Sequence, residues 1–246
     1  MPSGAEPACL RGCGPPGLSR PSRPAGRPLP PAWYARPATD VAPDLLNKIV
    51  AVGTPGPGSP AALEWRWARI VEVEAYQQED AASHAFRGPT RRNATMFGPG
   101  GLLYVYFTYG MHWCANVVTG PAGRGDAVLL RAAEPLGGIE AMGAGRSALA
   151  DRDLGRGPGR LGRALDLGAA DDGRPLTGPL RWWRPGGGDG RRVLILDDGV
   201  PPPDAPARGP RVGITRDVAL PWRFWIPGSP AVSGRPNRRA GPGFPG

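Results

Sequence analysis

One short segment of the chain, residues 69–76, combines residue types that can carry out chemistry. Side chains alternate between two faces over residues 70–76, which predicts a half-buried β-strand. Because successive strand side chains point to opposite faces, Glu74 and Tyr76 share a face. A carboxylate there can act as a general base or form an ordinary surface ion pair. The alternation assigns Val71, Val73 and Ala75 to one face, and Ile70, Glu72, Glu74 and Tyr76 to the other.

A second feature is a large aromatic residue at a predicted turn. Residues 102–107 are rich in aromatic and β-branched types, which is typical of a strand, and residues 113–118 predict another. The chain must turn between them, with Gly110 as the most permissive residue. Tyr109 is therefore expected at the tip of a hairpin, where its ring is badly placed for a core and well placed to insert into a partner.

The charge balance favours a polyanionic partner. The 246 residues carry a formal net charge of +9, almost entirely on arginine, since Lys48 is the only lysine. Such a surplus is typical of proteins that bind nucleic acids. A GC-rich genome explains the preference for arginine over lysine, whereas the partner explains the positive sum.

Cysteine and histidine are too scarce for a disulfide framework or a zinc site. The cysteines are Cys9, Cys13 and Cys114, and the only histidines are His84 and His112. We therefore expect no metal, no cofactor and a reducing, cytoplasmic environment. No apolar run reaches the ~20 residues needed to span a bilayer, and the N-terminus lacks the apolar region of a signal peptide.

Strand patterns outnumber helical patterns, and no βαβ rhythm occurs. Strands are predicted at 68–76, 102–107, 113–118, 127–132, 193–196, 211–214 and 222–226. Helices are predicted from a Thr39-Asp40 cap through Ile49, at 136–142 and at 158–168, with loops at 53–64, 77–100 and 168–190. We infer the α+β class: a single compact domain with a curved, mostly antiparallel β-sheet, few short helices and a protruding β-hairpin.

Composition divides the chain into three parts. Residues 1–32 are rich in Pro, Gly, Arg and Ser with hardly any aliphatic residues, which predicts a disordered extension. Residues 33–233 are expected to form the folded domain. Residues 234–246 have the composition of a flexible basic tail.

Several motifs follow one another in the predicted domain. They are Glu-Ala-Tyr at 74–76, Ser-His at 83–84, Met-Phe-Gly-Pro at 96–99, Leu-Tyr-Val-Tyr-Phe-Thr-Tyr-Gly-Met at 103–111, Cys-Ala-Asn at 114–116, Leu-Leu-Arg-Ala at 129–132, Gly-Pro-Gly-Arg-Leu at 157–161 and Ile-Pro-Gly-Ser-Pro at 226–230. In their order and spacing these motifs resemble the alkyladenine (3-methyladenine) DNA glycosylase family, as found in bacteria. The resemblance extends over roughly residues 33 to 233.

The resemblance implies a monofunctional enzyme of base-excision repair. Such an enzyme flips a nucleotide out of duplex DNA and hydrolyses the N-glycosidic bond of an alkylated or deaminated purine, such as 3-methyladenine, 7-methylguanine or hypoxanthine. We expect a monomer that binds double-stranded DNA containing damaged purines, touches no membrane and works at the bacterial nucleoid. Lys48 lies outside every motif, so a lyase step through a lysine Schiff base is not expected.

The resemblance also assigns roles to single residues. It implies that Glu74 is the catalytic carboxylate that activates water, and that Arg131 orients Glu74 and contacts a phosphate. Tyr109 would intercalate into the base stack. Arg160 and Ser229 would contact phosphates.

A pocket for the flipped base is implied as well. Tyr76, His84 and Tyr106 would form its walls, since aromatic rings stack on bases and attract the charge of an alkylated purine. Asn116 would lie at its floor and exclude the exocyclic amine of guanine. The segment Arg87–Asn93 departs from the usual bacterial pattern, which leaves its conformation and phosphate contacts open.

Plainer alternatives accompany these assignments. By themselves, the strand position of Glu74 favours an ion pair and the tyrosines favour core packing. Glu72 lies about 7 Å from Glu74 along the strand, a spacing that also suits an inverting sugar hydrolase, but the basic charge and the hairpin have no role there. We therefore interpret Glu72 as the partner of an arginine. A non-catalytic damaged-DNA-binding protein of the same fold remains as the other alternative.

Overall fold

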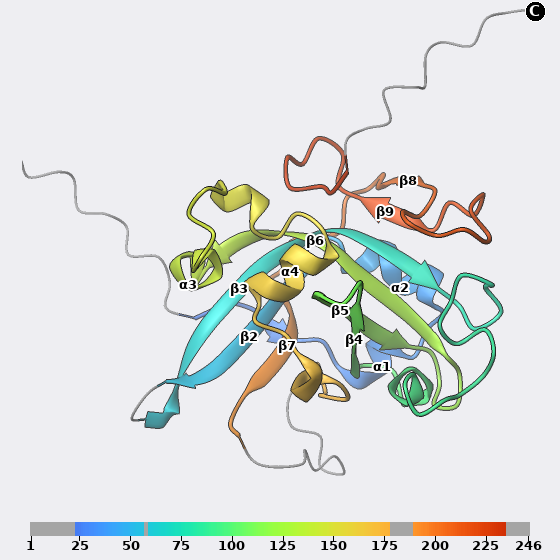
Figure 1. Cartoon of the computed structure of the whole chain (residues 1–246), viewed down its shortest axis with the longest axis horizontal. Helices are drawn as coiled ribbons and strands as arrows, with labels where there is room; N and C mark the ends of the chain where they lie inside the picture. The colour runs from blue at the N-terminus through green and yellow to red at the C-terminus, as the bar shows by residue number, and fades with distance from the viewer. Residues whose placement is uncertain (1–22, 57–58, 178–188, 235–246) are drawn as a thin grey trace, which may run out of the picture.

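The computed structural model describes residues 23–56, 59–177 and 189–234. Its central element is a nine-stranded sheet in which all paired strands are antiparallel. Seven strands follow the order β1-β7-β2-β3-β6-β5-β4, while β9 pairs with β3 and β8 pairs with β9. Figure 1 shows a strongly twisted sheet with short helices packed around it. The predicted α+β class is confirmed.

Two long central strands, β3 and β6, are surrounded by shorter elements. The strands are β1 (Arg27–Pro28), β2 (Ile49–Gly56), β3 (Ser59–Tyr76), β4 (Leu103–Thr108), β5 (His112–Thr119), β6 (Asp126–Gly137), β7 (Arg192–Asp197), β8 (Ala207–Gly209) and β9 (Arg223–Trp225). The α-helices are α1 (Pro31–Tyr34), α2 (Ala38–Leu45), α3 (Ile139–Gly143) and α4 (Pro158–Ala164), and 3-10 turns lie at Ala94–Phe97, Asp151–Asp153 and Ala169–Asp171. None of these helices has both the length and the apolar character needed to cross a bilayer.

Residues 70–75 of β3 are buried on both faces, so the prediction of a half-buried strand was wrong for this segment. Strand β3 lies between β2 and β6, and β9 pairs with its C-terminal part. Opposite β6, Ile70 pairs with Ala133 and Glu72 with Ala132, which leaves Val71 as a bulged residue. The bulge reverses the alternation, so Ile70 packs in the main core and Val71 packs in a separate cluster. The predicted faces of these two residues are therefore exchanged.

The β4–β5 hairpin agrees with the prediction. Thr108 pairs with His112 across a three-residue turn, and the Met111 amide donates to the Thr108 carbonyl at 3.2 Å. Tyr109 and Gly110 adopt positive φ angles of 51° and 66°, the left-handed conformation that such a turn requires. The Tyr109 side chain consequently points away from the core and is 81% exposed.

Helix α4 supports the hairpin from one side. Gly162 approaches β5 so closely that a Cβ atom there would lie 2.2 Å from the Trp113 carbonyl oxygen. The same packing brings Gly159 against His112, where a Cβ atom would lie 2.7 Å from the ring. Glycine at these positions therefore lets the segment Gly157–Arg160 lie beside the base of the hairpin.

Several predicted boundaries were wrong. Residues 53–64 belong mostly to β2 and β3 rather than to a loop, because pairing with neighbouring strands outweighs the local glycine and proline content. The first long helix starts after Pro37 and ends at Leu45, and Ile49 begins β2. Residues 211–214 form a loop instead of a strand.

The predicted extension was also too long at its inner end. Arg27 and Pro28 pair with β7, and α1 begins at Pro31, so regular secondary structure is present before residue 33. The remainder of the predicted extension, residues 1–22, and the tail from residue 235 lie outside the described residues.

Candidate active site

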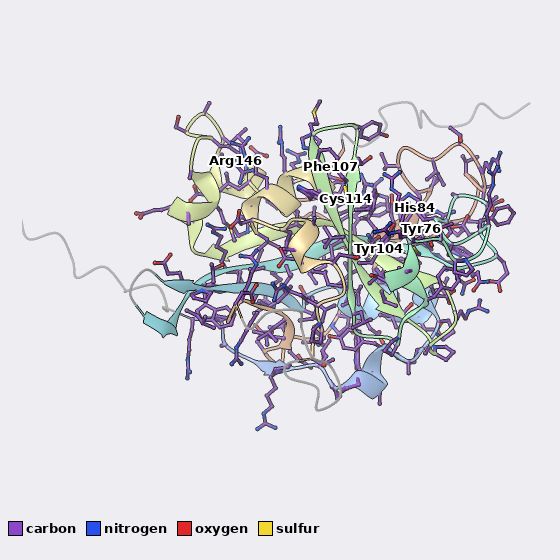
Figure 2. The ribbon with its side chains drawn as sticks, turned by 60° about the horizontal axis from the view of Figure 1, so that its bottom comes forward. Tyr76, His84, Tyr104, Phe107, Cys114 and Arg146 are labelled. Atoms are coloured by element: carbon purple, nitrogen blue, oxygen red, sulfur yellow. The ribbon has the colours of Figure 1, made fainter. Side chains whose placement is uncertain are left out.

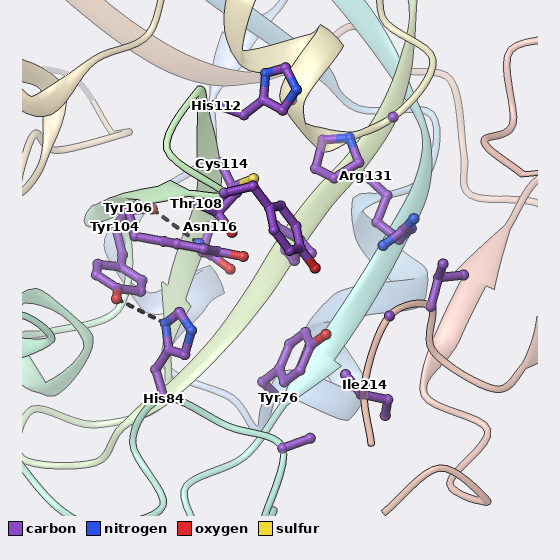
Figure 3. Close-up of a pocket in the computed structure, with 18 of the residues that line it drawn as sticks. Tyr76, His84, Tyr104, Tyr106, Thr108, His112, Cys114, Asn116, Arg131 and Ile214 are labelled. Carbon is purple, nitrogen blue, oxygen red and sulfur yellow. Dashed lines mark hydrogen bonds between the residues drawn. The ribbon is translucent and has the colours of Figure 1, made fainter. Parts of the chain in front are cut away.

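Four strands and three connecting segments line a cavity of about 680 Å³. Its walls come from β3 to β6, the loop after β3, the segment Gly157–Arg160 and the loop Val212–Arg216 (Figure 3). A volume of this size is typical of a site for a small molecule or a single base. Figure 2 places Tyr76, His84 and Tyr104 together on one side of the molecule, near Cys114 and with Phe107 above them on the hairpin.

Glu74 lies directly behind the wall of this cavity. Its side chain is fully buried, so the alternative of a surface ion pair was wrong. The Tyr76 hydroxyl donates to Oε2 at 2.9 Å, and the Val212 backbone amide donates to Oε1 at 2.7 Å. An Arg131 Nη1 atom lies 3.3 Å from Oε1. Because Tyr76, Val212 and Arg131 all line the cavity, the carboxylate is one hydrogen bond away from its surface.

Arg131 serves two carboxylates at once. Its Nε donates to Glu72 at 3.1 Å, while its Nη1 faces Glu74. Burial by itself would lower the pKa of Arg131, but the charges of Glu74 and Glu72 outweigh this effect and the net pKa is raised. The guanidinium therefore stays charged, and it joins the cavity wall to the carboxylates behind it.

Glu72 is the partner of arginines, as the sequence suggested. Besides Arg131, Arg223 donates its Nε to Glu72 Oε1 at 2.6 Å, and the Ser233 amide donates to Oε2 at 2.6 Å. Glu72 is fully buried and does not line the cavity. Two carboxylates facing one substrate, as a sugar hydrolase needs, are thus not present in this arrangement.

Three aromatic side chains form one wall. The rings of Tyr104 and Tyr106 stack with centroids 5.7 Å apart, and the His84 ring meets Tyr106 edge-on at 4.6 Å. Burial raises the pKa of Tyr106, and also that of Tyr76 across the cavity, where the Glu74 charge adds to the effect. Burial also raises the pKa of Tyr104 to about 12, so the hydroxyls of Tyr76, Tyr104 and Tyr106 all remain neutral at pH 7.

Tyr104 is a wall residue that the sequence analysis missed. It follows the strand alternation two residues before Tyr106, so the pattern itself contained the signal. Its hydroxyl lies 3.1 Å from His84 Nδ1, and its carbonyl accepts from the Asn116 side-chain amide at 3.2 Å (Figure 3). Tyr104 therefore fixes both the imidazole and the amide, and Asn116 lines the cavity from β5.

The loop after β3 presents His84 to the cavity. Asn93 holds this loop, because its side chain donates to the His84 carbonyl at 2.8 Å and accepts from the Thr90 amide at 2.5 Å. The segment that departs from the family pattern is thus closed by its own hydrogen bonds. Partial burial against the tyrosines lowers the pKa of His84, and the nearby charge of Arg92 lowers it further. The imidazole is consequently neutral at pH 7.

A buried arginine that the sequence analysis also missed lies behind Tyr76. The Arg211 guanidinium binds both oxygens of Asp80 and donates to the Ala75 carbonyl. It stacks over the Tyr76 ring at 4.5 Å and over the Trp222 ring at 5.3 Å. Arg211 thereby fixes Tyr76 and the start of the loop that carries Val212. No local pattern indicated this role, because residues 211–214 were predicted as a strand.

Of the two predicted phosphate contacts, Arg160 and Ser229, only Arg160 lines the cavity. Arg160 lines the mouth of the cavity, and so does Arg216, which the sequence analysis did not single out. Ser229 does not line it, and its hydroxyl accepts from the Ala231 amide at 3.3 Å. Tyr109 stands at the mouth, on the hairpin. Among the described residues, no three His, Cys, Asp or Glu side chains are grouped to hold a metal ion.

Comparisons with known proteins agree on one family. The methylpurine-DNA glycosylase model matches residues 32–230. A protein of Burkholderia lata is 51% identical over 216 residues, which cover 87% of this chain and 95% of its own length. Relatives from Frankia casuarinae and Streptomyces avermitilis are 46% and 45% identical, cover 84% of this chain, and are themselves covered to 93% and 91%. All three bear the provisional name 3-methyladenine DNA glycosylase.

The environment of His84 predicts its titration. Its pKa should lie below the ordinary value of about 6.5, and Arg92→Gln should raise it by removing a nearby charge. In the wild type, the unfolded state binds the His84 proton more tightly than the folded state does. This difference lowers the free energy of unfolding as the pH drops through about 6.5. An NMR titration measures the His84 pKa directly, with Arg208→Gln on β8 as the control, since the Arg208 charge is not among the causes that lower the His84 pKa. A pKa at or above 6.5 in the wild type would contradict the prediction.

Proposed function

Since the chain belongs to the methylpurine-DNA glycosylase family, we propose that it flips damaged purines out of duplex DNA and hydrolyses their N-glycosidic bonds. The enzyme is a DNA glycosylase, and the proposed substrates are 3-methyladenine, 7-methylguanine and hypoxanthine. The observation that carries the proposal is the buried Glu74 carboxylate, held by three donors directly behind an aromatic cavity. A DNA substrate would bring the protein, as a monomer, to the bacterial chromosome in the cytoplasm.

The cavity suits a purine that has left the base stack. Tyr76 faces His84 and Tyr106 across it, so a flat ring can be held between aromatic surfaces. N-alkylated purines carry a positive charge, and neutral tyrosine rings attract cations through their faces. In this proposal Asn116 discriminates against normal guanine, whose exocyclic amine would meet the fixed amide on β5.

Glu74 is the proposed general base. A carboxylate offers about four acceptor positions, and three are used by Tyr76, Val212 and Arg131. In this proposal the remaining position, on Oε2, accepts a hydrogen bond from the attacking water molecule. Transfer of a proton from that water to Glu74 generates the nucleophile that attacks the sugar carbon as the base departs. The negative charge of Glu74 also stabilises the positive charge that develops on the sugar.

The surface around the cavity supports a DNA-binding role. Tyr109 is proposed to enter the stack where the flipped nucleotide was, since its ring is exposed and fixed at a tight turn. Arg160 and Arg216 border the cavity from opposite loops and can bind the flanking phosphates. Ser229 is retained as a more distant phosphate contact, because its hydroxyl hydrogen is still free to donate. Arg131 acts on Glu74 in this proposal, and its contact with a phosphate is secondary.

The position of Lys48 supports a monofunctional reaction. Its ammonium group binds Asp197 at 2.9 Å and the Val200 carbonyl at 3.4 Å, at the start of β2. It does not line the cavity. A lyase reaction needs an amine beside the sugar, so hydrolysis by water is the pathway that the arrangement supports. The product would be an intact strand with an abasic site.

The first prediction concerns Glu74→Gln. The amide keeps the shape of the side chain and cannot accept the proton of water, so base release should fall by about a hundredfold or more. Binding to DNA that contains hypoxanthine should persist. Single-turnover release from such a duplex measures the effect, and Glu79→Gln, which removes an exposed carboxylate, is the matched control. If the wild type binds damaged DNA but releases no base, the non-catalytic alternative holds.

The second prediction concerns Tyr109→Ser. Base–aromatic stacking contributes about 1–3 kcal/mol, so affinity for damaged DNA should decrease about tenfold to a hundredfold. The melting temperature should not change, because the side chain makes little contact with the core. Tyr109→Phe keeps the ring and should bind almost normally. A large fall in melting temperature for the serine variant would show instead that Tyr109 supports the fold.

The third prediction concerns the absence of a covalent intermediate. Incubation with damaged DNA and borohydride should trap no protein–DNA adduct, and strands should break only after alkali treatment. A bifunctional glycosylase provides the positive control. An adduct that disappears in Lys48→Ala would overturn the assignment of water as the nucleophile.

A further inference from the structure

We propose that Glu72 and Arg223 act as a positioning pair that controls how strongly Arg131 holds the catalytic carboxylate. This inference rests on the proposed role of Glu74 as the general base. Neither Glu72 nor Arg223 lines the cavity, so neither is a catalytic residue in the sense of touching the substrate. Their effect on the reaction would pass through Arg131.

The sharing of one guanidinium is the central observation. Arg131 places Nε 3.1 Å from Glu72 and Nη1 3.3 Å from Glu74. The attraction of Arg131 to one carboxylate therefore weakens the stabilisation that it gives to the other. The side chains of both carboxylates are fully buried, and that of Arg131 is 9% exposed. Buried charges are screened little by water, so a small shift of Arg131 between the two carboxylates changes the stability of the Glu74 anion considerably.

Arg223 completes the charge balance of the group. It approaches Glu72 from β9 with Nε at 2.6 Å, and its Nη2 donates to the Ser233 carbonyl at 2.9 Å. Its guanidinium also lies over the Trp225 ring at 4.8 Å. These contacts fix Arg223 on Glu72, so two arginines neutralise two glutamates. Arg223 therefore neutralises part of the charge of Glu72, and Nη1 of Arg131 can stay beside Glu74.

The bulged pairing of β3 makes this arrangement. Register shifts lie on both sides of Glu72, opposite the part of β6 that contains Arg131. On the other edge, β9 pairs Trp225 with Glu72 and Arg223 with Glu74. The bulge thus brings two glutamates of one strand within reach of arginines from both neighbouring strands.

Removal of either member of the pair should have opposite consequences. The charged and titratable groups around Glu74 are Glu72 and Tyr76 on β3, Tyr106 on β4, Arg131 on β6, Arg211 behind Tyr76 and, through Glu72, Arg223 on β9. In Glu72→Gln, Arg131 no longer pairs with a second carboxylate and interacts more strongly with Glu74. The Glu74 carboxylate is then more stable as an anion and weaker as a base. In Arg223→Gln, Glu72 draws Arg131 away, which destabilises the anion.

The test is the pH profile of single-turnover base release from a duplex that contains hypoxanthine. The acid limb of this profile is the fall in rate at low pH, where the proposed base becomes protonated. Relative to the wild type, this limb should move to lower pH in Glu72→Gln and to higher pH in Arg223→Gln, each by about one pH unit. The plateau rate of Glu72→Gln should fall severalfold. His84 also titrates in the acid range, but it is common to all variants and cancels in the comparison.

Three controls separate this positioning role from a structural role. Arg223→Lys keeps the charge and should restore the wild-type limb. Arg69→Gln removes a comparably buried arginine that lies five residues before Glu74 on β3 and pairs with Asp198, and this variant should leave the limb unchanged. The double variant Glu72→Gln/Arg223→Gln removes equal and opposite charges, so its limb should lie between those of the single variants. It also keeps the test valid if Glu72→Gln alone does not fold.

Shifts in the same direction for both single variants, or no shift in either, would overturn the inference. The outcome is distinguishable from a failure of the proposed function. If the wild type is active and Glu74→Gln is inactive, but the limbs do not move, only the positioning role is wrong. If the wild type releases no base at all, the general-base assignment fails and this inference fails with it.

Discussion

The charge of Glu74, buried in the middle of the sheet, is the constraint on which the rest of the site depends. Removing a carboxylate from water costs several kcal/mol even after the protein relaxes, unless nearby groups compensate. Compensation here comes from Arg131 on the adjacent strand, from the Tyr76 hydroxyl and from the Val212 amide. The residues that supply these three groups also line the cavity, so the residues that compensate the buried charge connect it to the cavity surface.

The same requirement explains how the loops are fastened to the sheet. The amide that donates to Glu74 belongs to the segment after β8, and this segment is held by Arg211 on Asp80 and by Asp217 on the Ala81 amide at 2.6 Å. The two loops that close the cavity are therefore tied to one another as well as to the sheet. A site supported in this way keeps its donors in place before the substrate arrives, which limits the reorganisation that a reaction requires.

Sequence patterns predicted those features that depend on neighbours along the chain. The hairpin, the exposure of Tyr109 and the shared face of Glu74 and Tyr76 follow from alternation and from turn residues within a few positions. The bulge at Val71 was not predictable, because it depends on the register against β6, a strand some sixty residues later. Arg211 was missed for a related reason, since its role depends on Asp80, 131 residues earlier in the sequence.

The arginine content illustrates both the value and the limit of composition. The net charge predicted a polyanionic partner, but an arginine paired with a carboxylate contributes nothing to that net charge. Arg131 and Arg211 are such residues, and they act inside the protein. The surplus must lie on other arginines, and Arg160 and Arg216 are two that reach the mouth of the cavity from different loops. One residue type thus occupies two kinds of position, beside buried carboxylates and at the mouth of the cavity, and only the fold determines which position each arginine takes.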